Sequence, residues 1–231
     1  MAYYLPPEVE YFPHPFLSES EGLLAFSDDL TTEQVILAYQ FGIFPWNNPD
    51  DPICWWYTYP RLVLYPHKVK ISKSMKRYFK NPIFSVTADT AFEKVIEKCR
   101  VNDRNGQAGT WITDRIMTTF SELHHRGIAH SIEVWEEGNL VGGLYGIALG
   151  RIFYGESMFT EVSNASKYAL IHLCKYLEEK EFWLIDCQQE TSHLSSMGGE
   201  LLSKEDFFDI LKKNIFQDHH RGRWEGALYE N

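Results

Sequence analysis

The sequence predicts an α+β fold in which a small N-terminal domain precedes a larger domain built on a mixed sheet. Three observations lead to this prediction. Residues 1–60 are rich in proline and aromatic residues and show little strand pattern. From Arg61 onward, strand and helix patterns alternate, and the run Asn139–Phe159 has the character of two long apolar strands. A long helical segment and one more short apolar run follow these strands.

The N-terminal domain is expected to span residues 1–62. Its one clear helix starts at Thr31–Gln34, which fits a capping box, and ends at Gly42. The next segment is dense in Trp, Tyr and Pro and should be rigid and irregular, because proline fixes φ and large rings pack at low entropic cost.

Three tryptophans stand close together in this segment. We expect Trp55 and Trp56 to pack the small domain against the larger one. Trp46 lies between a proline and two asparagines, and this polar setting favours a side chain that faces a ligand.

The larger domain is expected to span residues 63–231, with a first strand that begins at Arg61. Alternating apolar residues predict further strands at 84–88, 129–135, 139–149, 152–159 and 183–187. Helical spacing and capping residues predict helices at 72–80, 90–100, 113–126, 163–179 and 203–213, with a second capping box at Thr90–Glu93.

The run Asn139–Phe159 predicts the floor of a pocket. It is unusually rich in glycine, which weakens a strand interior and is tolerated where the chain bends or another backbone approaches closely. The same run offers Glu156 among apolar neighbours. The glycines are Gly142, Gly143, Gly146, Gly150 and Gly155, preceded by Gly138.

The order of the elements resembles an acetyltransferase-like (GNAT-type) layout, in which a helix crosses from the fourth to the fifth strand. A CoA-binding member would place a glycine-rich pyrophosphate loop at the start of the long helix. Residues 163–167 read Ser-Asn-Ala-Ser-Lys, without glycine, which disfavours CoA.

Asp186 and Gln188 stand at the end of a short buried strand. Two residues apart on a strand, their side chains would point to one side, so the Gln188 amide could supply the donor that a buried carboxylate needs. The alternative is a structural carboxylate that accepts from a nearby backbone N–H, and the sequence by itself favours that alternative.

Composition and motifs exclude several classes of protein. The net charge of −10 disfavours indiscriminate nucleic-acid binding, because phosphate contacts need Lys and Arg. Scattered cysteines and histidines without metal-ligand spacing predict neither a disulfide framework nor a metal site. Gly155–Phe159 lacks the last glycine of a hydrolase elbow. Without a signal peptide or a bilayer-spanning run, we expect a cytoplasmic protein with no membrane partner.

One dense basic segment stands out against the acidic background. Lys73, Lys76, Arg77 and Lys80 share a helix face at i, i+3, i+4 and i+7. Such a face can be merely solvated or can bind phosphates, and the sequence alone leaves both interpretations open.

Six ordered blocks resemble those of the leucyl/phenylalanyl-tRNA–protein transferases, and the resemblance extends from Phe12 to about Phe208. So many blocks in order make chance implausible. The blocks are GIFPW (42–46), GTWI (109–112), HSIEVW (130–135), GESMF (155–159), NASK (164–167) and DCQ (186–188).

The resemblance implies an enzyme with an acetyltransferase-like domain that uses no CoA and no other cofactor. It implies transfer of Leu or Phe, and also Met, from aminoacyl-tRNA to proteins with N-terminal Arg or Lys. This transfer marks the acceptor for bacterial N-end-rule degradation. Two alternatives stay open: a CoA-dependent N-acyltransferase and a non-catalytic tRNA-binding protein.

The resemblance also assigns roles to residues of this chain. Glu156, Asp186 and Gln188 would form the polar reaction centre, and Trp46 and Trp111 would line the site for the terminal adenosine and the aminoacyl group. The basic helix with Lys73, Lys76, Arg77 and Lys80 would hold tRNA phosphates. The transferred side chain would be surrounded by Leu144, Met158, Leu170, Leu173, Leu177 and Ile185.

The implied reaction is aminolysis of an ester, which needs no ATP, metal or covalent enzyme intermediate. An α-amino group has a pKa of about 8, so an appreciable fraction is neutral near neutral pH. The enzyme then chiefly positions the reactants and stabilises the developing oxyanion. We expect Gln188, held by Asp186, to orient the reactants and Glu156 to attract the basic acceptor end.

Three places depart from the family pattern. Residues 24–30 read LAFSDDL where the family usually has LAxGGDL, residues 202–204 read Leu-Ser-Lys instead of Ile-Pro-Arg, and Gln189 replaces a usual Val. We expect these departures to change local loop shape rather than the reaction.

Overall fold

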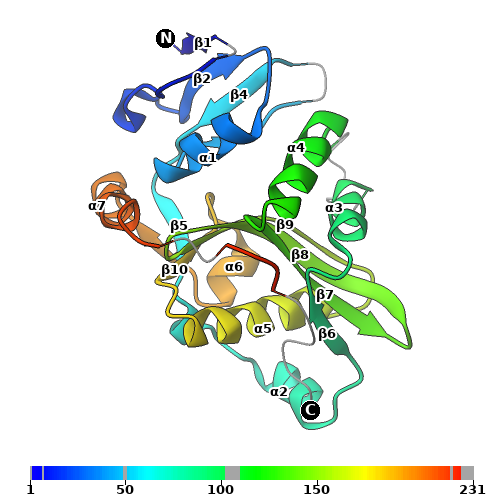
Figure 1. Ribbon diagram of the computed structural model, residues 1–231. Helices are drawn as coiled ribbons and strands as arrows, with labels where there is room; N and C mark the ends of the chain where they lie inside the picture. Colours follow the sequence, from blue (N-terminus) through cyan, green and yellow to red (C-terminus); the bar gives the residue numbers. More distant parts are fainter. Residues whose placement is uncertain (1, 7, 49–50, 102–109, 219–220, 225–231) are drawn as a thin grey trace.

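Two β-sheets organise the chain, with helices packed around the larger one (Figure 1). The computed structural model describes residues 2–6, 8–48, 51–101, 110–218 and 221–224. Gly109 of the GTWI block lies outside these ranges. The α+β class is confirmed. The division of the chain into domains at residue 62 stays a prediction.

The N-terminal sheet has four strands in the order β1-β2-β4-β3. The expectation of little strand structure before residue 60 is wrong, because strands this short show no clear alternation. The strands are β1 (Tyr3–Leu5), β2 (Leu23–Ser27), β3 (Phe44–Pro45) and β4 (Ile53–Trp56).

Helix α1 (Thr32–Gln40) begins with the predicted capping box. The Gln34 N–H donates to Thr31 Oγ1 at 3.1 Å, and the Thr31 N–H donates to Gln34 Oε1 at 2.9 Å. The reciprocal pair satisfies two backbone donors that the first helical turn leaves free. A short 3₁₀ helix, η1 (Pro15–Leu17), precedes this region.

The larger sheet has seven strands in the order β11-β5-β10-β9-β8-β7-β6. All neighbours are antiparallel except β9 and β10, which run parallel. The edge strand β11 was not predicted. The strands are β5 (Arg61–Leu64), β6 (Ser85–Ala88), β7 (Ala129–Glu136), β8 (Asn139–Leu149), β9 (Ile152–Thr160), β10 (Leu184–Asp186) and β11 (Glu200–Leu202).

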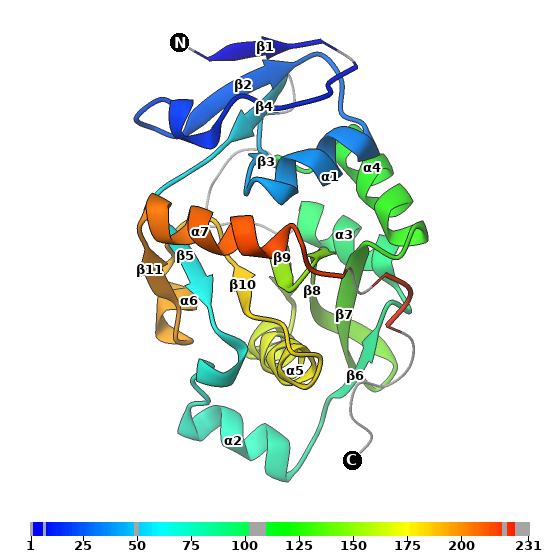
Figure 2. The same ribbon diagram turned by 60° about the vertical axis from the view of Figure 1, so that its left-hand side comes forward.

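Helices cover both faces of this sheet (Figures 1 and 2). Helix α5 crosses between the parallel strands β9 and β10 and packs on one face, while α3 and α4 pack on the other. The helices are α2 (Lys73–Lys80), α3 (Phe92–Val101), α4 (Asp114–His125), α5 (Ala165–Glu179), α6 (Ser192–Ser196) and α7 (Lys204–Asn214), with a 3₁₀ turn η2 (Pro66–Lys68).

The capping box predicted at Thr90 is wrong. The Thr90 hydroxyl donates to Glu133 Oε2 at 2.9 Å, and α3 begins only at Phe92. Glu133 is fully buried, so it recruits nearby hydroxyls as donors, and Ser131 contributes another. A tertiary contact therefore outweighs the local helix signal at this position.

The glycines of β8 let other parts of the chain approach closely. A Cβ at Gly142 would lie 2.5 Å from the Cβ of Ala165, the first residue of α5. The β8–β9 register shifts between Tyr145 and Gly146, which places a bulge in the middle of the predicted pocket floor. Close helix packing and one bulge thus explain glycines that a regular strand would not need.

Two of the departures from the family pattern have local structural roles. The Ser27 hydroxyl donates to the Asp29 carbonyl at 2.7 Å and accepts from Trp55 Nε1 at 2.9 Å. Ser203 caps α7 and accepts from the Asp206 N–H at 3.1 Å. Both serines stabilise the ends of their own segments.

Trp55 lies in the core of the N-terminal part. It packs edge-on against Phe12 with 5.0 Å between ring centroids, and its indole N–H donates to the Ser27 hydroxyl at 2.9 Å. Trp56 lies edge-on against Trp46, with 5.6 Å between ring centroids. One apolar cluster contains Trp55 together with Tyr145 and Tyr154 of the larger sheet, and Trp56 packs against it. The expected role of the two tryptophans in joining the domains stays a prediction. Among the described residues, no helix has both the length and the apolar character that crossing a membrane requires.

Substitution of Gly142 by Ala should destabilise the fold, because the new methyl group would overlap α5. We expect a loss of about 1–3 kcal/mol, the usual range for overpacking, in urea unfolding. Gly155→Ala is the matched control on β9, since its added Cβ would come no closer than 3.6 Å to its neighbours. Equal stability losses in the two variants would contradict this account.

Candidate active site

A pocket of ≈ 840 Å³ lies where β8 and β9, α5, the end of β10 and the N-terminal part meet. Strand β10 pairs with β9 only as far as Tyr154, so the following residues of β9 have no β10 neighbour. The pocket lies along this part, Gly155–Met158, and along the segment Cys187–Gln189 that follows β10. The short β10 therefore leaves open the edge where the pocket forms.

The deep part of the pocket is apolar. Leu144 comes from β8, Met158 from β9 and Ile185 from β10, and Leu170 and Leu173 come from α5. These five predicted residues meet at one place. Leu177, one turn further along α5, is fully buried and does not line the pocket.

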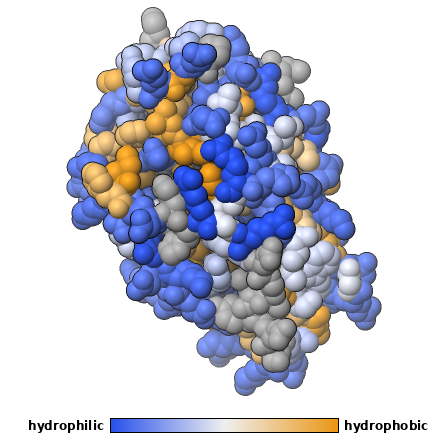
Figure 3. Space-filling view, in the orientation of Figure 1, coloured by the Kyte–Doolittle hydropathy of each residue, from blue (hydrophilic) through white to orange (hydrophobic). Residues whose placement is uncertain are grey.

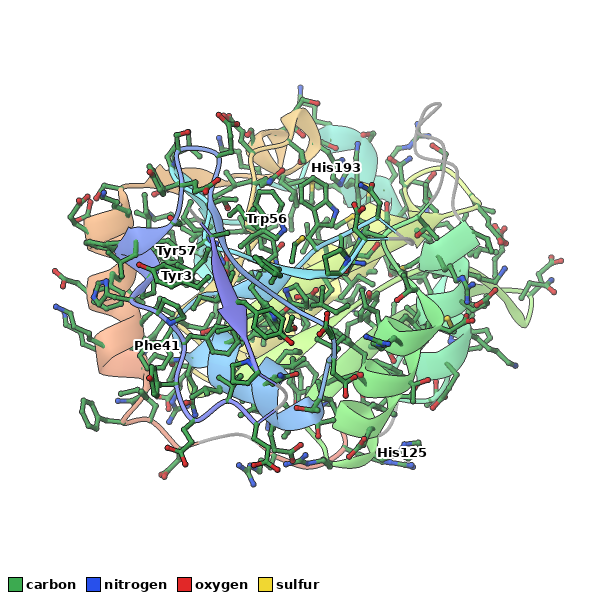
Figure 4. The ribbon with its side chains drawn as sticks, turned by 90° about the horizontal axis from the view of Figure 1, so that it is seen from above. Tyr3, Phe41, Trp56, Tyr57, His125 and His193 are labelled. Atoms are coloured by element: carbon green, nitrogen blue, oxygen red, sulfur yellow. The ribbon has the colours of Figure 1, made fainter. Side chains whose placement is uncertain are left out.

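The mouth of the pocket carries the two predicted tryptophans, Trp46 and Trp111. Trp46 is 41% exposed, which is high for so large a ring, and Trp56 Nε1 fixes its backbone by donating to the Trp46 carbonyl at 2.6 Å. Figure 4 labels Trp56 in the view from above, together with His193, which lines the pocket. The hydrogen bond from Trp56 thus helps to hold Trp46 at the mouth of the pocket.

Glu156 projects from β9 into the pocket wall. Tyr39 from α1 donates its hydroxyl to Glu156 Oε1 at 2.6 Å, and Gln188 Nε2 donates to the same oxygen at 3.3 Å. Burial raises the pKa of Glu156 to about 8, although the Tyr39 hydrogen bond opposes the shift. The carboxyl group is therefore largely neutral near pH 7.

Gln188 has a backbone conformation that few residues adopt. Its φ is 55°, and the Gln189 N–H closes a tight turn on the Cys187 carbonyl at 2.7 Å. β10 ends at Asp186, so the expected strand alternation does not reach Gln188, and its amide points to Glu156 instead of Asp186. Such conformations persist only when neighbouring contacts impose them.

Asp186 holds that turn through the backbone. Its Oδ1 accepts from the Gln188 N–H at 3.0 Å, which is the alternative that the sequence favoured. The carboxylate is fully buried and does not line the pocket. Asp186 is therefore placed to position Gln188 rather than to touch a substrate.

The donor that Asp186 needs is Arg61, which the sequence analysis missed. Arg61 Nε and Nη2 each approach one carboxylate oxygen of Asp186 at 2.7 Å, in a two-pronged pair with both side chains buried. A charged residue opening the otherwise apolar run Arg61–Leu64 was the available signal.

Arg61 also joins the two sheets. Its Nη2 donates to the Gly42 carbonyl at 2.9 Å, after α1, and its guanidinium lies 5.0 Å from the ring centre of Phe44 in β3. The Phe207 ring of α7 lies 4.8 Å from the same group. One side chain thus contacts the N-terminal part, the last helix and the strand that carries Asp186.

Other pocket residues were missed for a similar reason. Phe153 and Tyr145 belong to the predicted floor, but strand alternation cannot say which face a pocket occupies. His193 lines the pocket from α6, and Tyr39 reaches Glu156 from a residue far away in sequence. Only the three-dimensional arrangement brings these side chains to the site.

The basic residues lie outside the pocket, on α2. Lys73, Lys76, Arg77 and Lys80 are all exposed, while Met75 on the opposite side of the helix is buried. The helix is attached to α5 through Phe79, whose ring stacks on Tyr168 at 4.7 Å. The four charges thus form a solvent-facing row, as the sequence predicted.

The arrangement suits a reaction between two bound groups beside a polar wall. An apolar cavity can hold a hydrophobic side chain, and the neutral Glu156 and the Gln188 amide offer hydrogen bonds next to it. Among the described residues no group of three or more His, Cys, Asp or Glu side chains is arranged to hold a metal ion, and the four cysteines are free.

Comparison with known proteins finds one consistent family. The sequence pattern described as "Leucyl/phenylalanyl-tRNA protein transferase" matches residues 63–212, and that of its N-terminal domain matches residues 28–58. A leucyl/phenylalanyl-tRNA–protein transferase of Syntrophobacter fumaroxidans is 50% identical over 93% of this chain and 92% of its own. One of Hydrogenovibrio crunogenus is 44% identical over 96% of this chain and 88% of its own.

Likeness to solved structures is more distant. A GCN5-related N-acetyltransferase from Kribbella flavida superposes with a TM-score of 0.38 at 9% identity, over 73% of this chain and 60% of that chain. The fold class therefore rests on the sheet order and on the helix that crosses between β9 and β10.

Removal of Arg61 should leave the Asp186 charge buried without its partner. We expect Arg61→Met to lower the free energy of unfolding by about 3–5 kcal/mol, and the double variant R61M/D186L to lose less than R61M. Lys68→Ala, which breaks an exposed pair with Glu200, should cost no more than about 1 kcal/mol. Urea unfolding of all three tests this, and an R61M loss no larger than that of K68A would refute it.

The raised pKa of Glu156 predicts a dependence of stability on pH. Between the ordinary value of 4.5 and the value of about 8, the folded protein holds a proton that the unfolded chain releases. This residue's contribution to stability therefore falls as pH rises through that window. Glu156→Gln should remove that fall, so its stability relative to the wild type should increase from pH 4.5 to pH 8. A constant difference across urea titrations at several pH values would disprove the assignment.

Proposed function

The chain belongs to the leucyl/phenylalanyl-tRNA–protein transferase family, and we propose that its pocket receives the aminoacyl end of the donor tRNA. As a member of this family it is an aminoacyltransferase, which moves an amino acid from aminoacyl-tRNA to a protein acceptor. The observation that carries the proposal is an apolar cavity with a polar wall of Glu156 and Gln188 beside it.

The lining of the cavity favours a large apolar donor, namely Leu, Phe or Met. The deep end of the cavity has an apolar surface without a charged group, formed by Leu144, Leu170, Leu173 and Ile185. Met158 adds an unbranched, polarizable side chain that adapts to aliphatic and aromatic guests alike. A donor with a charged side chain would lose its hydration there without a partner.

The rings of Trp46 and Trp111 suit the nucleoside end of the donor. Both lie at the pocket, and Trp46 exposes a large part of its ring. Exposed aromatic faces stack on bases, which contributes about 1–3 kcal/mol per base. Stacking of the terminal adenosine there would place the adjoining ester over Glu156 and Gln188.

The reaction is attack of the acceptor α-amine on the carbonyl carbon of the aminoacyl ester. A C–N bond forms, the C–O bond to the terminal ribose breaks, and the amine proton ends on the departing ribose hydroxyl. The ester is already activated relative to the amide that forms, so the balance needs no ATP. The protein's task is to align amine and ester and to stabilise the oxyanion.

Gln188 is the hydrogen-bonding group that orients the reactants, and Asp186 positions it. A neutral amide is too weak a base to remove a proton, but its N–H and carbonyl can bind oxyanion and amine. The turn at Gln188 is held by Asp186 Oδ1 and by β5, where Cys187 donates to the Leu62 carbonyl at 2.9 Å. The amide is thereby fixed before substrates arrive.

Glu156 attracts the basic end of the acceptor. A cationic group beside it would favour the ionised carboxylate, so binding of an N-terminal Arg or Lys would lower its raised pKa. We propose that acceptors begin with Arg or Lys, and that the transfer marks them for N-end-rule degradation in the cytoplasm.

The exposed row on α2 is the proposed contact for tRNA phosphates. The protein has a net charge of −10 and as a whole repels nucleic acid, so these four positive side chains form a local site that attracts phosphates.

The space-filling view shows a mostly hydrophilic surface, with apolar side chains gathered near α7 and the N-terminal part (Figure 3).

The first turn of α5 argues against a CoA-dependent acyltransferase. Asn164, which precedes it, has a φ of 73°, and β8 packs so closely that a Cβ at Gly142 would lie 3.2 Å from the Ser166 nitrogen. A pyrophosphate needs free backbone N–H groups at such a helix start. The packing of β8 against these groups disfavours that ligand.

The function is tested by incubating the protein with radiolabelled Leu-tRNA or Phe-tRNA and a peptide that begins with Arg. Label in this peptide, and not in one that begins with Ala, is the expected result. Label that stays on bound tRNA would indicate a non-catalytic tRNA-binding protein. Binding of acetyl-CoA in calorimetry would instead indicate the CoA-dependent alternative.

Gln188→Ala should lower kcat for transfer at saturating tRNA and peptide, because the orienting amide is lost. We expect a fall of about 100-fold, the range found when one donor to an oxyanion is removed. Gln217→Ala, on the segment after α7, is the matched control. Nearly unchanged kcat in Q188A would show that the amide does not act in the reaction.

Charge reversal on α2 should weaken tRNA binding at low salt. We expect K73E/K76E/R77E to lose affinity and to flatten the dependence of log Kd on log salt by about one unit for each phosphate contact removed. The triple variant K180E/K212E/K213E changes the same charge elsewhere and should keep the wild-type slope. Filter binding at several salt concentrations measures both, and equal slopes would exclude α2 as the contact.

A further inference from the structure

The segment after α7 returns to the central sheet and ends its described part in a buried tryptophan. In Figure 2 it runs from the end of α7 across to the start of β7. Gly222 donates to the Gly127 carbonyl at 3.1 Å, and Trp224 is only 6% exposed. No role in the reaction described above requires a tryptophan at this place.

Trp224 lies in an aromatic socket. Its ring stacks on His130 of β7, with 3.8 Å between centroids and 4° between planes. Tyr176 of α5 lies 4.8 Å away, and Phe182 lies 6.2 Å away in an edge-on orientation. Ring contacts of this kind stabilise a structure beyond the effect of the area that the rings bury.

Polar contacts fix the backbone at the same point. The Trp224 N–H donates to Asp89 Oδ2 at 2.7 Å, and His130 Nδ1 lies 2.9 Å from the same oxygen. The other oxygen of Asp89 accepts from the Ser131 N–H at 3.0 Å. These contacts fix the backbone of the segment after α7 at Trp224, so the indole has one position against β7.

The fourth ring beside Trp224 belongs to the donor pocket. Phe153 of β9 lies 5.8 Å from Trp224 between ring centroids, and it also lines the pocket. On another side its ring covers Gly146, where an added Cβ would lie 2.6 Å from Phe153 Cε1. The Phe153 ring is therefore confined between the backbone of β8 and the ring of Trp224.

We propose that Trp224 is a specificity-determining residue of the transfer reaction, which it reaches by positioning Phe153. The indole supports the Phe153 ring from behind and so sets the size of the apolar end of the pocket. This inference rests on the proposed function, because it assumes that the donor side chain occupies that end. Trp224 does not itself line the pocket.

Loss of the indole would leave space into which Phe153 can move. Core side chains relax toward a new cavity only in part, and the pocket would gain some of the freed volume. A larger apolar end should accept Phe more readily and hold Leu less tightly. Since one methylene of fit in an apolar pocket changes selectivity about 10-fold or more, the effect is measurable.

The test compares kcat/KM for Leu-tRNA and Phe-tRNA in the same preparation of full-length Trp224→Ala. Any loss of folded protein affects both donors equally and cancels in the ratio. We expect the ratio of Phe to Leu to rise about tenfold. Trp224→Phe, which keeps a ring in the socket, should retain most of the wild-type preference.

Phe216→Ala is the matched control, because Phe216 is an aromatic residue of the same segment that is 85% exposed. It should leave the ratio unchanged. Phe153→Leu should by itself shift the ratio. Adding W224A to F153L should cause little further change, because Trp224 acts on the pocket through the Phe153 ring. Should W224A not fold, Trp224→Leu provides the same comparison.

An unchanged ratio in folded W224A or W224L, or equal shifts in the F216A control, would overturn the inference. Failure of the proposed function has a different signature. In that case the wild-type protein would transfer neither amino acid to the peptide, whatever residue stands at position 224.

Discussion

The buried pair between Arg61 and Asp186 connects the parts of the molecule that meet at the pocket. Two charges removed from water are stable together when their mutual attraction and additional hydrogen bonds offset the lost hydration. The guanidinium also donates from Nη2 to the Gly42 carbonyl and from Nη1 to the Thr58 hydroxyl, and it approaches rings from β3 and α7. The carboxylate also accepts from the Gln188 N–H. Through this one contact, the position of the N-terminal part and the turn that aims the Gln188 amide depend on each other.

The shape of the pocket follows from an incomplete pairing of strands. β10 accompanies β9 only for Leu184–Asp186, and α5 has to cross over the sheet to allow their parallel alignment. Beyond that point Glu156 and Met158 of β9 line the pocket, and Leu170 and Leu173 in the middle of α5 supply part of the apolar wall. A longer β10 would fill the site, so a short strand is a condition for the proposed reaction.

The charged and titratable groups at α2 and at the pocket differ in a way that suits two different substrates. An acidic protein repels nucleic acid in general, and under the proposed function the exposed row on α2 would give tRNA a preferred approach. The pocket wall, in contrast, contains a carboxyl group kept neutral by burial and by its neighbours. Such a group ionises most readily when a cation arrives, which suits an acceptor with a basic end.

The α+β class, the α1 capping box, the β7–β8 hairpin and nine of the twenty described residues that line the pocket could be predicted from the sequence alone, because local spacing and the ordered blocks carry that information. The sequence did not reveal the partner of Asp186, the Tyr39 contact to Glu156, or the return of Trp224 to the sheet. Arg61 and Asp186 are 125 residues apart, and Tyr39 and Glu156 are 117 apart. No local pattern encodes contacts at such separations: they arise only when the sheets pack, and buried charges and rings then take the partners that the packing brings within reach.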